Sequence, residues 1–192
     1  MAPGPGKWKV VLVVEDDTDG KALRELVQAS GLPILLDWLP ANGIGNIKRN
    51  GAKLVELARS RFKAGTGCVA VLVDRDGKDV RKAEPHRTIR RHCVSRGAAY
   101  VEAVESLEAW FLADPAIAEW LGLKQHGSVD AVKDPKKVIA AAFYKQTRRT
   151  YQKRRSRQQV AQHAAGIDSG RSVSWRAAIA RLVPCLASGC RR

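Results

Sequence analysis

Apolar runs alternate with amphipathic segments along the first half of the chain. Residues 8–14 and 68–73 are nearly continuous apolar runs rich in valine, and each ends in acidic residues. Such runs are typical of parallel strands that are buried on both faces. Residues 34–39 and 98–104 are predicted to be further strands. The segments between the strands are predicted to be helices at 19–29, 52–62 and 80–96, with a Gly/Asn-rich loop at 43–51.

The second half of the chain has no convincing strand after residue 104. Its apolar spacing predicts helices at 106–113, 115–121, 135–143, 157–165 and 173–186. We therefore expect an α/β fold with a mostly parallel, four-stranded sheet flanked by helices, followed by a helical extension. Residues 1–132 would form the α/β domain and residues 133–192 an extension packed on it, with 130–135 as the best seam. The 192 residues are enough to bury a core without disulfides or a structural metal.

Three acidic clusters follow predicted strands. The carboxyl ends of strands in an open α/β sheet line one crevice, so we expect the clusters to meet there. Carboxylates that converge repel one another unless protons or cations intervene, and Mg²⁺ or Mn²⁺ is the natural cation for oxygen ligands. At least one of Asp16 and Asp17 is expected to cap a helix instead, as is Asp114. The predicted metal ligands are Glu15, Asp19, Asp74, Asp76, Glu105 and Glu108.

The charge of the chain indicates a polyanionic partner. The formal net charge is +15, and residues 133–192 hold 15 basic and 2 acidic residues. Lysines and arginines along a phosphate backbone release its counterions, a contribution to affinity that does not depend on sequence. We therefore predict that nucleic acid binds along the densest basic stretch, residues 145–157. Its basic residues are Lys145, Arg148, Arg149, Lys153, Arg154, Arg155 and Arg157.

Several other classes of protein are disfavoured. No apolar window reaches 18 residues and the N-terminus lacks a signal-peptide pattern, so we expect a cytoplasmic protein without a membrane partner. The four cysteines have no zinc spacing and are expected to be reduced, although Cys185 and Cys190 lie near enough in sequence to pair. No P-loop or dinucleotide fingerprint is present, and the four histidines are scattered.

Three sequence motifs resemble the Toprim domain found in topoisomerases, primases and OLD-type nucleases. VVEDDTD at 13–19 and VLVDRDG at 71–77 look like a strand ending in Glu and a later strand ending in Asp-x-Asp. ESLEAWFLAD at 105–114 further resembles small stand-alone Toprim-like proteins of bacterial defence and mobile-element neighbourhoods. The resemblance implies a Mg²⁺-dependent nuclease of DNA or RNA in which Glu15 is the general acid/base or a metal ligand and Asp74 and Asp76 bind metal. The resemblance is also consistent with a role in anti-phage defence and with a partner protein such as a separately encoded ATPase.

The sequence departs from the Toprim pattern at one position, and two alternative functions stay open. Toprim domains usually carry Gly directly after the motif-one Glu, but Asp16 occupies that position here, which puts catalysis in doubt. A non-catalytic effector or regulator that binds nucleic acid is the first alternative. The second is a receiver-like domain, because VLVVEDD also begins phosphoacceptor receivers, with Asp74 as the acceptor. No Lys-Pro dipeptide marks the fifth strand of a receiver, and Asp76 and Glu108 would have no role in one.

Overall fold

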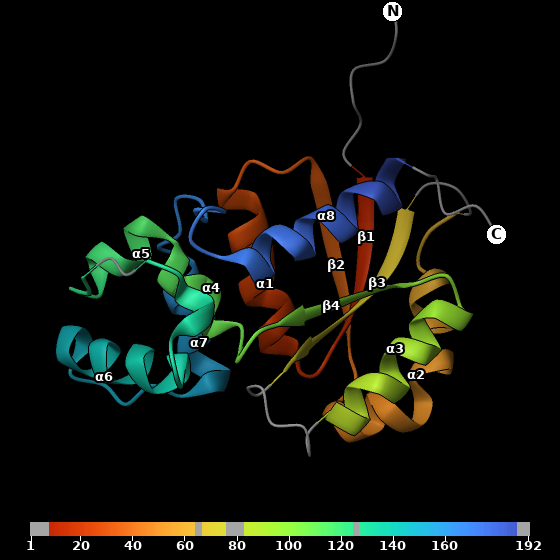
Figure 1. The fold of residues 1–192 in the computed structure, drawn as a ribbon, viewed down its shortest axis with the longest axis horizontal. Helices are drawn as coiled ribbons and strands as arrows, with labels where there is room; N and C mark the ends of the chain where they lie inside the picture. Colours follow the sequence, from red (N-terminus) through yellow and green to blue (C-terminus); the bar gives the residue numbers. More distant parts are fainter. Residues whose placement is uncertain (1–7, 64–66, 76–82, 125–126, 188–192) are drawn as a thin grey trace, which may run out of the picture.

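Four parallel strands form the centre of the fold. The computed structural model describes residues 8–63, 67–75, 83–124 and 127–187. The strands are β1 (Trp8–Val14), β2 (Ile34–Pro40), β3 (Gly67–Asp74) and β4 (Ala99–Ala103), and their order in the sheet is β2-β1-β3-β4. Every neighbouring pair is parallel. The predicted α/β fold with a four-stranded parallel sheet flanked by helices is confirmed (Figure 1).

Each face of the sheet is covered by its own helices. Val11 and Val13 of β1 pack into one apolar cluster with residues of α2 (Ile44–Arg59) and α3 (Ala83–Ser95). Val10 and Leu12 face the other way, into a cluster with α1 (Asp17–Ala29), α7 (Lys153–Ala161) and α8 (Val173–Ala187). Successive side chains of a strand point to opposite faces, so a run buried at every position supplies both cores.

The remaining helices lie beside the sheet, near α7 (Figure 1). They are α4 (Glu108–Ala113), α5 (Pro115–Trp120), the 3-10 turn η2 (Val129–Ala131) and α6 (Pro135–Thr147). None of the helices in the described ranges is long and apolar enough to cross a membrane. The side chains of Cys68 and Cys93 are buried and not disulfide-bonded.

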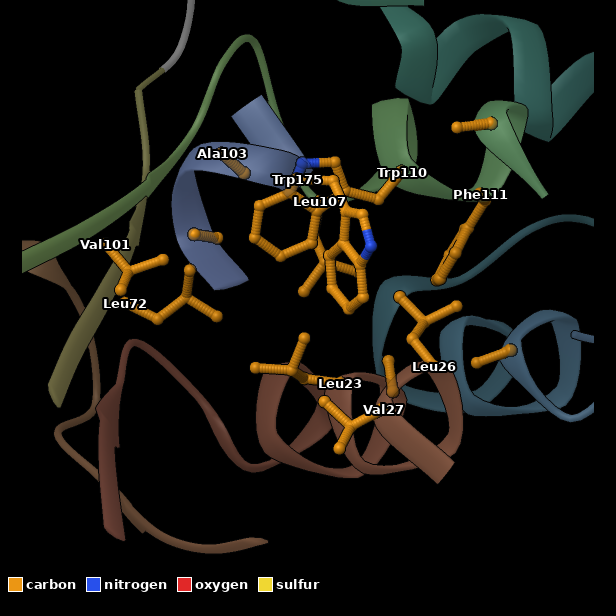
Figure 2. Packing of buried hydrophobic residues seen from close by; sticks show 14 of the residues in the cluster. Leu23, Leu26, Val27, Leu72, Val101, Ala103, Leu107, Trp110, Phe111 and Trp175 are labelled. Carbon is orange, nitrogen blue, oxygen red and sulfur yellow. The ribbon is translucent and has the colours of Figure 1, made fainter. Parts of the chain in front are cut away.

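The C-terminal residues complete the main core. Trp110 of α4 and Trp175 of α8 pack edge to face, with ring centroids 5.2 Å apart, and Leu23 and Leu26 of α1 belong to the same cluster (Figure 2). The indole N–H of Trp110 donates to Ser174 Oγ at 2.8 Å. Residues of the predicted extension thus share one apolar core with α1 and α4.

One predicted loop is wrong. The sequence predicts a loop over residues 43–51, but α2 begins at Ile44 and runs through this segment. A Cβ at Gly51 would come within 3.2 Å of the His92 ring, so the glycine lets α2 approach α3 closely. Tertiary packing here outweighs the low helix propensity of Gly and Asn. The helices α6 and α7 also differ from prediction, because α6 continues to Thr147 and α7 begins at Lys153.

Candidate active site

Two acidic residues meet at the point where the strand order reverses. β1 and β3 are neighbours, and their connections leave in opposite directions toward β2 and β4. Glu15 follows β1, Asp74 ends β3, and the backbone N–H of Asp74 donates to Glu15 Oε1 at 3.3 Å. Such a reversal opens a crevice at the carboxyl ends of the strands, where α/β proteins bind ligands. The structure thus brings these two predicted site residues together.

The turn after β4 adds a third carboxylate. Asp74 Oδ1 accepts a hydrogen bond from the backbone N–H of Leu107 at 2.9 Å. The next residue, Glu108, is the first of α4 and is completely buried. Glu105 has a positive φ of 62° in the same turn, a conformation that costs energy in residues other than glycine. This backbone turn therefore places Glu108 beside Asp74.

Arg157 of α7 lies inside the acidic cluster. Its side chain is only 1% exposed, and its Nη2 donates to both oxygens of Glu108, at 2.7 and 2.8 Å. Nη1 donates to Asp19 Oδ1, and Nη2 lies 3.6 Å from Asp74 Oδ2. One guanidinium thus contacts a carboxylate from each of the three predicted clusters. This corrects the prediction that Arg157 lies on an exposed phosphate track, because a side chain so deeply buried does not reach an external backbone.

Lys153 lies on the same face of α7 as Arg157. Its Nζ is 2.6 Å from Asp16 Oδ2 and 3.3 Å from Asp19 Oδ1, and its side chain is 28% exposed. In this structure Lys153 therefore pairs with the acids rather than forming part of an outward basic surface. Tyr151, just before α7, donates its hydroxyl to Glu108 Oε1 at 3.0 Å. These contacts attach α7 to the mouth of the crevice.

The local electrostatics differ sharply among these groups. Burial, together with the nearby charges of Glu108 and Glu15, raises the pKa of Asp74 well above its usual value. Burial tends to raise the pKa of Asp16, but hydrogen bonds from Lys153 and Thr18 outweigh it, so that pKa is lowered. Burial tends to lower the pKa of Lys153, but its hydrogen bond to Asp16 and the surrounding carboxylates outweigh it and raise that pKa. Burial and the neighbouring carboxylates thus disfavour the ionised form of Asp74 in the absence of a further cation.

The buried arginine stays charged near neutral pH. Desolvation lowers the pKa of Arg157 to about 10, and the carboxylates of Asp16 and Glu15 act in the opposite direction. Desolvation also raises the pKa of the Tyr151 hydroxyl, with Glu108 adding to the effect. Tyr151 is therefore a neutral hydrogen-bond donor in this site.

The other predicted acids have distinct positions. Asp16 is the N-cap of α1, accepting from the Thr18 N–H at 2.9 Å, so one of the two expected helix caps is confirmed. The indole N–H of Trp38 donates to Asp17 at 2.8 Å. Asp114 caps α5 as expected. Within the described ranges, no contact joins the Glu105 side chain to the acidic cluster. Asp76 lies outside the described residues.

The donor chemistry fits a hard cation at Glu15 and Asp74. Both offer carboxylate oxygens, which Mg²⁺ and Mn²⁺ prefer, and crowding at Asp74 favours a nearby positive charge. The hydroxyl of Ser106, in the β4–α4 turn, is buried and has no hydrogen-bond partner among the described residues. No group of three or more His, Cys, Asp or Glu residues in the described part could hold a metal ion. The oxygens of Asp19 and Glu108, also predicted as ligands, are directed at Arg157.

The rest of the predicted phosphate track lies at the surface. Five of its basic residues are exposed, at the end of α6, after it and on the outer face of α7. They are Lys145, Arg148, Arg149, Arg154 and Arg155. Arg148 adopts a left-handed conformation that ends α6. Their exposure is compatible with phosphate contacts.

Comparisons with known proteins give no relative for this chain. No family model, no curated protein and no solved structure matches it.

The sequence does not predict two features of the site. Nothing in the local pattern assigns the hydroxyls of Tyr151 and Ser106 to it. The inward position of Lys153 and Arg157 does have a signal, because they are spaced four residues apart and followed by Val160 and Ala161. That spacing places all four on one stripe of a helix, and Val160 and Ala161 belong to the buried core.

Proposed function

We propose that this chain is a nuclease that cleaves phosphodiester bonds of nucleic acid with the help of Mg²⁺ or Mn²⁺. One observation carries the proposal: Glu15 contacts Asp74 at the reversal point of a parallel sheet, where burial and the charges of Glu108 and Glu15 raise the pKa of Asp74. These two residues would hold the metal, together with Asp76. A divalent ion held there would supply charge neutralisation at the phosphate and a lowered pKa of bound water.

The chain's own residues supply the rest of the site. Arg157 and Lys153 neutralise Asp19, Asp16 and Glu108, so these acids are held in place without drawing the metal away from Glu15 and Asp74. Tyr151 fixes Glu108 from the other side. The exposed basic residues between Lys145 and Arg155 would bind the phosphates that flank the scissile bond.

A cleavage assay tests this proposal. Purified protein is incubated with labelled single-stranded and duplex DNA and RNA in Mg²⁺, Mn²⁺ or EDTA. We expect divalent-dependent products from the wild type, and loss of at least about 100-fold in rate for Asp74→Asn, as for removal of a group that stabilises the transition state. Glu119→Gln, which changes an exposed acid of α5, is the matched control and should retain activity.

A second function is favoured by the buried arginine. Arg157 is bidentate to Glu108 and also contacts Asp19 and Asp74. It therefore neutralises part of the negative charge of the crevice without a metal ion. The protein would then be a non-catalytic effector or regulator that binds nucleic acid through its basic surface. Binding without cleavage in any divalent ion, with equal affinity for wild type and Asp74→Asn, would support this alternative.

The receiver alternative has less support. Receiver-type sheets have five strands in the order 2-1-3-4-5, whereas the described residues form four strands. The receiver alternative requires that acetyl phosphate phosphorylates Asp74. Anti-phage defence and a separately encoded ATPase partner stay predictions.

A further inference from the structure

A second basic surface lies on the opposite face of the sheet from α7. It is formed by the solvent-facing sides of α2 and α3, and we call it the α2–α3 surface. Its exposed basic residues are Arg49 and Lys53 on α2 and Arg87 and Arg91 on α3. Arg49, Lys53 and Arg91 form no ion pair with the residues that the structure describes, whereas Arg87 lies 3.4 Å from Glu84. Positive charge on this surface is therefore incompletely neutralised by the protein.

The two helices form a rigid unit. His92 of α3 packs against Gly51 of α2, and its Nε2 lies 3.1 Å from the Lys48 carbonyl oxygen. Val55, Ile89 and Cys93 fill the core beneath them. At the far end, Arg59 donates to the Arg96 carbonyl oxygen. Basic side chains on such a preorganised surface lose less conformational entropy on binding than side chains on a loop.

This surface is connected to the acidic crevice. The backbone N–H of Gly43, the N-cap of α2, donates to the Glu15 carbonyl oxygen at 2.9 Å. The N-terminus of α2 therefore begins beside Glu15, and Arg49 and Lys53 follow along the helix. Figure 1 shows α2 and α3 on one side of the sheet and α6 and α7 on the other. Basic residues thus flank the crevice on both sides.

The chemistry of the surface favours double-stranded nucleic acid. Single-strand binding sites combine basic residues with exposed aromatic rings on which bases stack. Among the large exposed apolar side chains, those on α2 and α3 are the aliphatic Leu57 and Val94. Basic residues without such rings can contact phosphates but give unpaired bases nothing to stack on. A duplex needs no such rings, because its bases already stack on one another and its phosphates face outward.

We propose that the α2–α3 surface is a second phosphate-binding surface and that it binds a nucleic-acid duplex. This inference rests on the proposed function for the identity of the ligand class, but it concerns binding and needs no cleavage.

Binding measured in EDTA tests the inference independently of catalysis. The full chain is titrated against a fluorescently labelled duplex and the corresponding single strand at several salt concentrations. The test variant combines Lys53→Gln on α2 with Arg91→Gln on α3, so it removes two positive charges, as the control variant does. The control variant combines Arg176→Gln on α8 with Lys124→Gln, which also remove exposed positive charges. Circular dichroism of both variants is the control for folding.

The expected result is a weaker duplex affinity for the test variant and a shallower salt dependence. The slope of log K against log salt should decrease by roughly 0.9 for each phosphate that the variant no longer neutralises. The control should lose less affinity, and single-strand binding by the test variant should change less than duplex binding. An unchanged duplex slope, or an equal loss in the control variant, would overturn the inference. An inactive protein whose duplex binding still depends on α2 and α3 would refute the nuclease proposal while supporting this one.

Discussion

Arg157 donates two hydrogen bonds from one guanidinium nitrogen to both oxygens of Glu108, a residue 49 positions earlier in the chain. Both side chains are buried, with 1% and 0% of their surface exposed. The pair joins α7 to the start of α4. Because the same arginine contacts Asp19 at the start of α1, it connects three segments that are distant in sequence. The acidic site and the C-terminal helices are consequently one structural unit.

Replacing Arg157 should destabilise the protein strongly. Arg157→Ala would leave the buried Glu108 without its cation, while Asp19 would keep only Lys153, and removing one partner of a buried ion pair typically costs about 3–5 kcal/mol. Chemical denaturation followed by circular dichroism measures the change in the free energy of unfolding. Arg155→Ala, which truncates an exposed arginine of the same helix, is the control and should change that free energy by less than about 0.5 kcal/mol. Equal stabilities for the two variants would contradict the structural role given to Arg157.

Removing the charge of Asp74 should stabilise the metal-free protein. Its pKa is raised in the folded state relative to the ordinary value of 3.8. Ionisation therefore costs folding free energy, and the wild type loses stability as the pH rises from that value through the folded pKa. Asp74→Asn keeps an oxygen to accept the hydrogen bond from Leu107 but carries no charge.

Thermal unfolding in EDTA across a pH series measures this effect. Asp74→Asn should melt at a higher temperature than the wild type near neutral pH, and the difference should shrink as the pH falls toward 3.8. Glu119→Gln, at an exposed acid, should show little difference at any pH. A variant less stable than the wild type near neutral pH would show that the carboxylate of Asp74 is favourably neutralised in the folded protein.

Much of the fold was predictable because its signals are local. The run from residue 8 to residue 14 is short, rich in valine and apolar at almost every position, which is typical of a strand covered on both faces. The acids after β1 and β3 could be assigned to one crevice, since parallel strands end at the same edge. Glu15 and Asp74 accordingly lie together.

The rest depended on contacts between distant residues. The density of basic residues favoured an exposed position for Lys153 and Arg157. In the structure, the carboxylates of Asp19 and Glu108 offset the desolvation cost of burying these two cations. Only the three-dimensional arrangement brings α7 against α1. In the same way, the Gly-rich segment at 43–51 has low intrinsic helix propensity, and its helical state depends on packing against His92.

Gly20 provides a separate test of how α1 packs on the sheet. A Cβ at this position would lie 2.2 Å from the ring of Trp38 on β2, so the indole has to move if a methyl group is added. Gly20→Ala should lower the free energy of unfolding by about 1–3 kcal/mol, as is usual for overpacked sites. The gain in helix propensity from Ala, about 1 kcal/mol, opposes this loss only in part.

Denaturation of Gly20→Ala and of Gly45→Ala separates the two effects. Gly45 is exposed in α2, and the atom nearest to its added Cβ is the guanidinium of Arg49 at 3.8 Å, so Ala should be tolerated there. A stabilised Gly20→Ala variant would mean that Trp38 does not pack against α1 as described. Its hydrogen bond to Asp17 would then also be in question.

The most direct measurement of the central claim is the position of a divalent ion in crystals of the full chain soaked in Mn²⁺. Anomalous scattering locates manganese without assumptions about the ligands. We predict a peak within coordination distance, about 2.0–2.3 Å, of carboxylate oxygens of both Glu15 and Asp74, and no such peak in Asp74→Asn crystals. Crystals with no manganese at these carboxylates, while Arg157 remains bonded to Glu108, would contradict a metal-dependent nuclease.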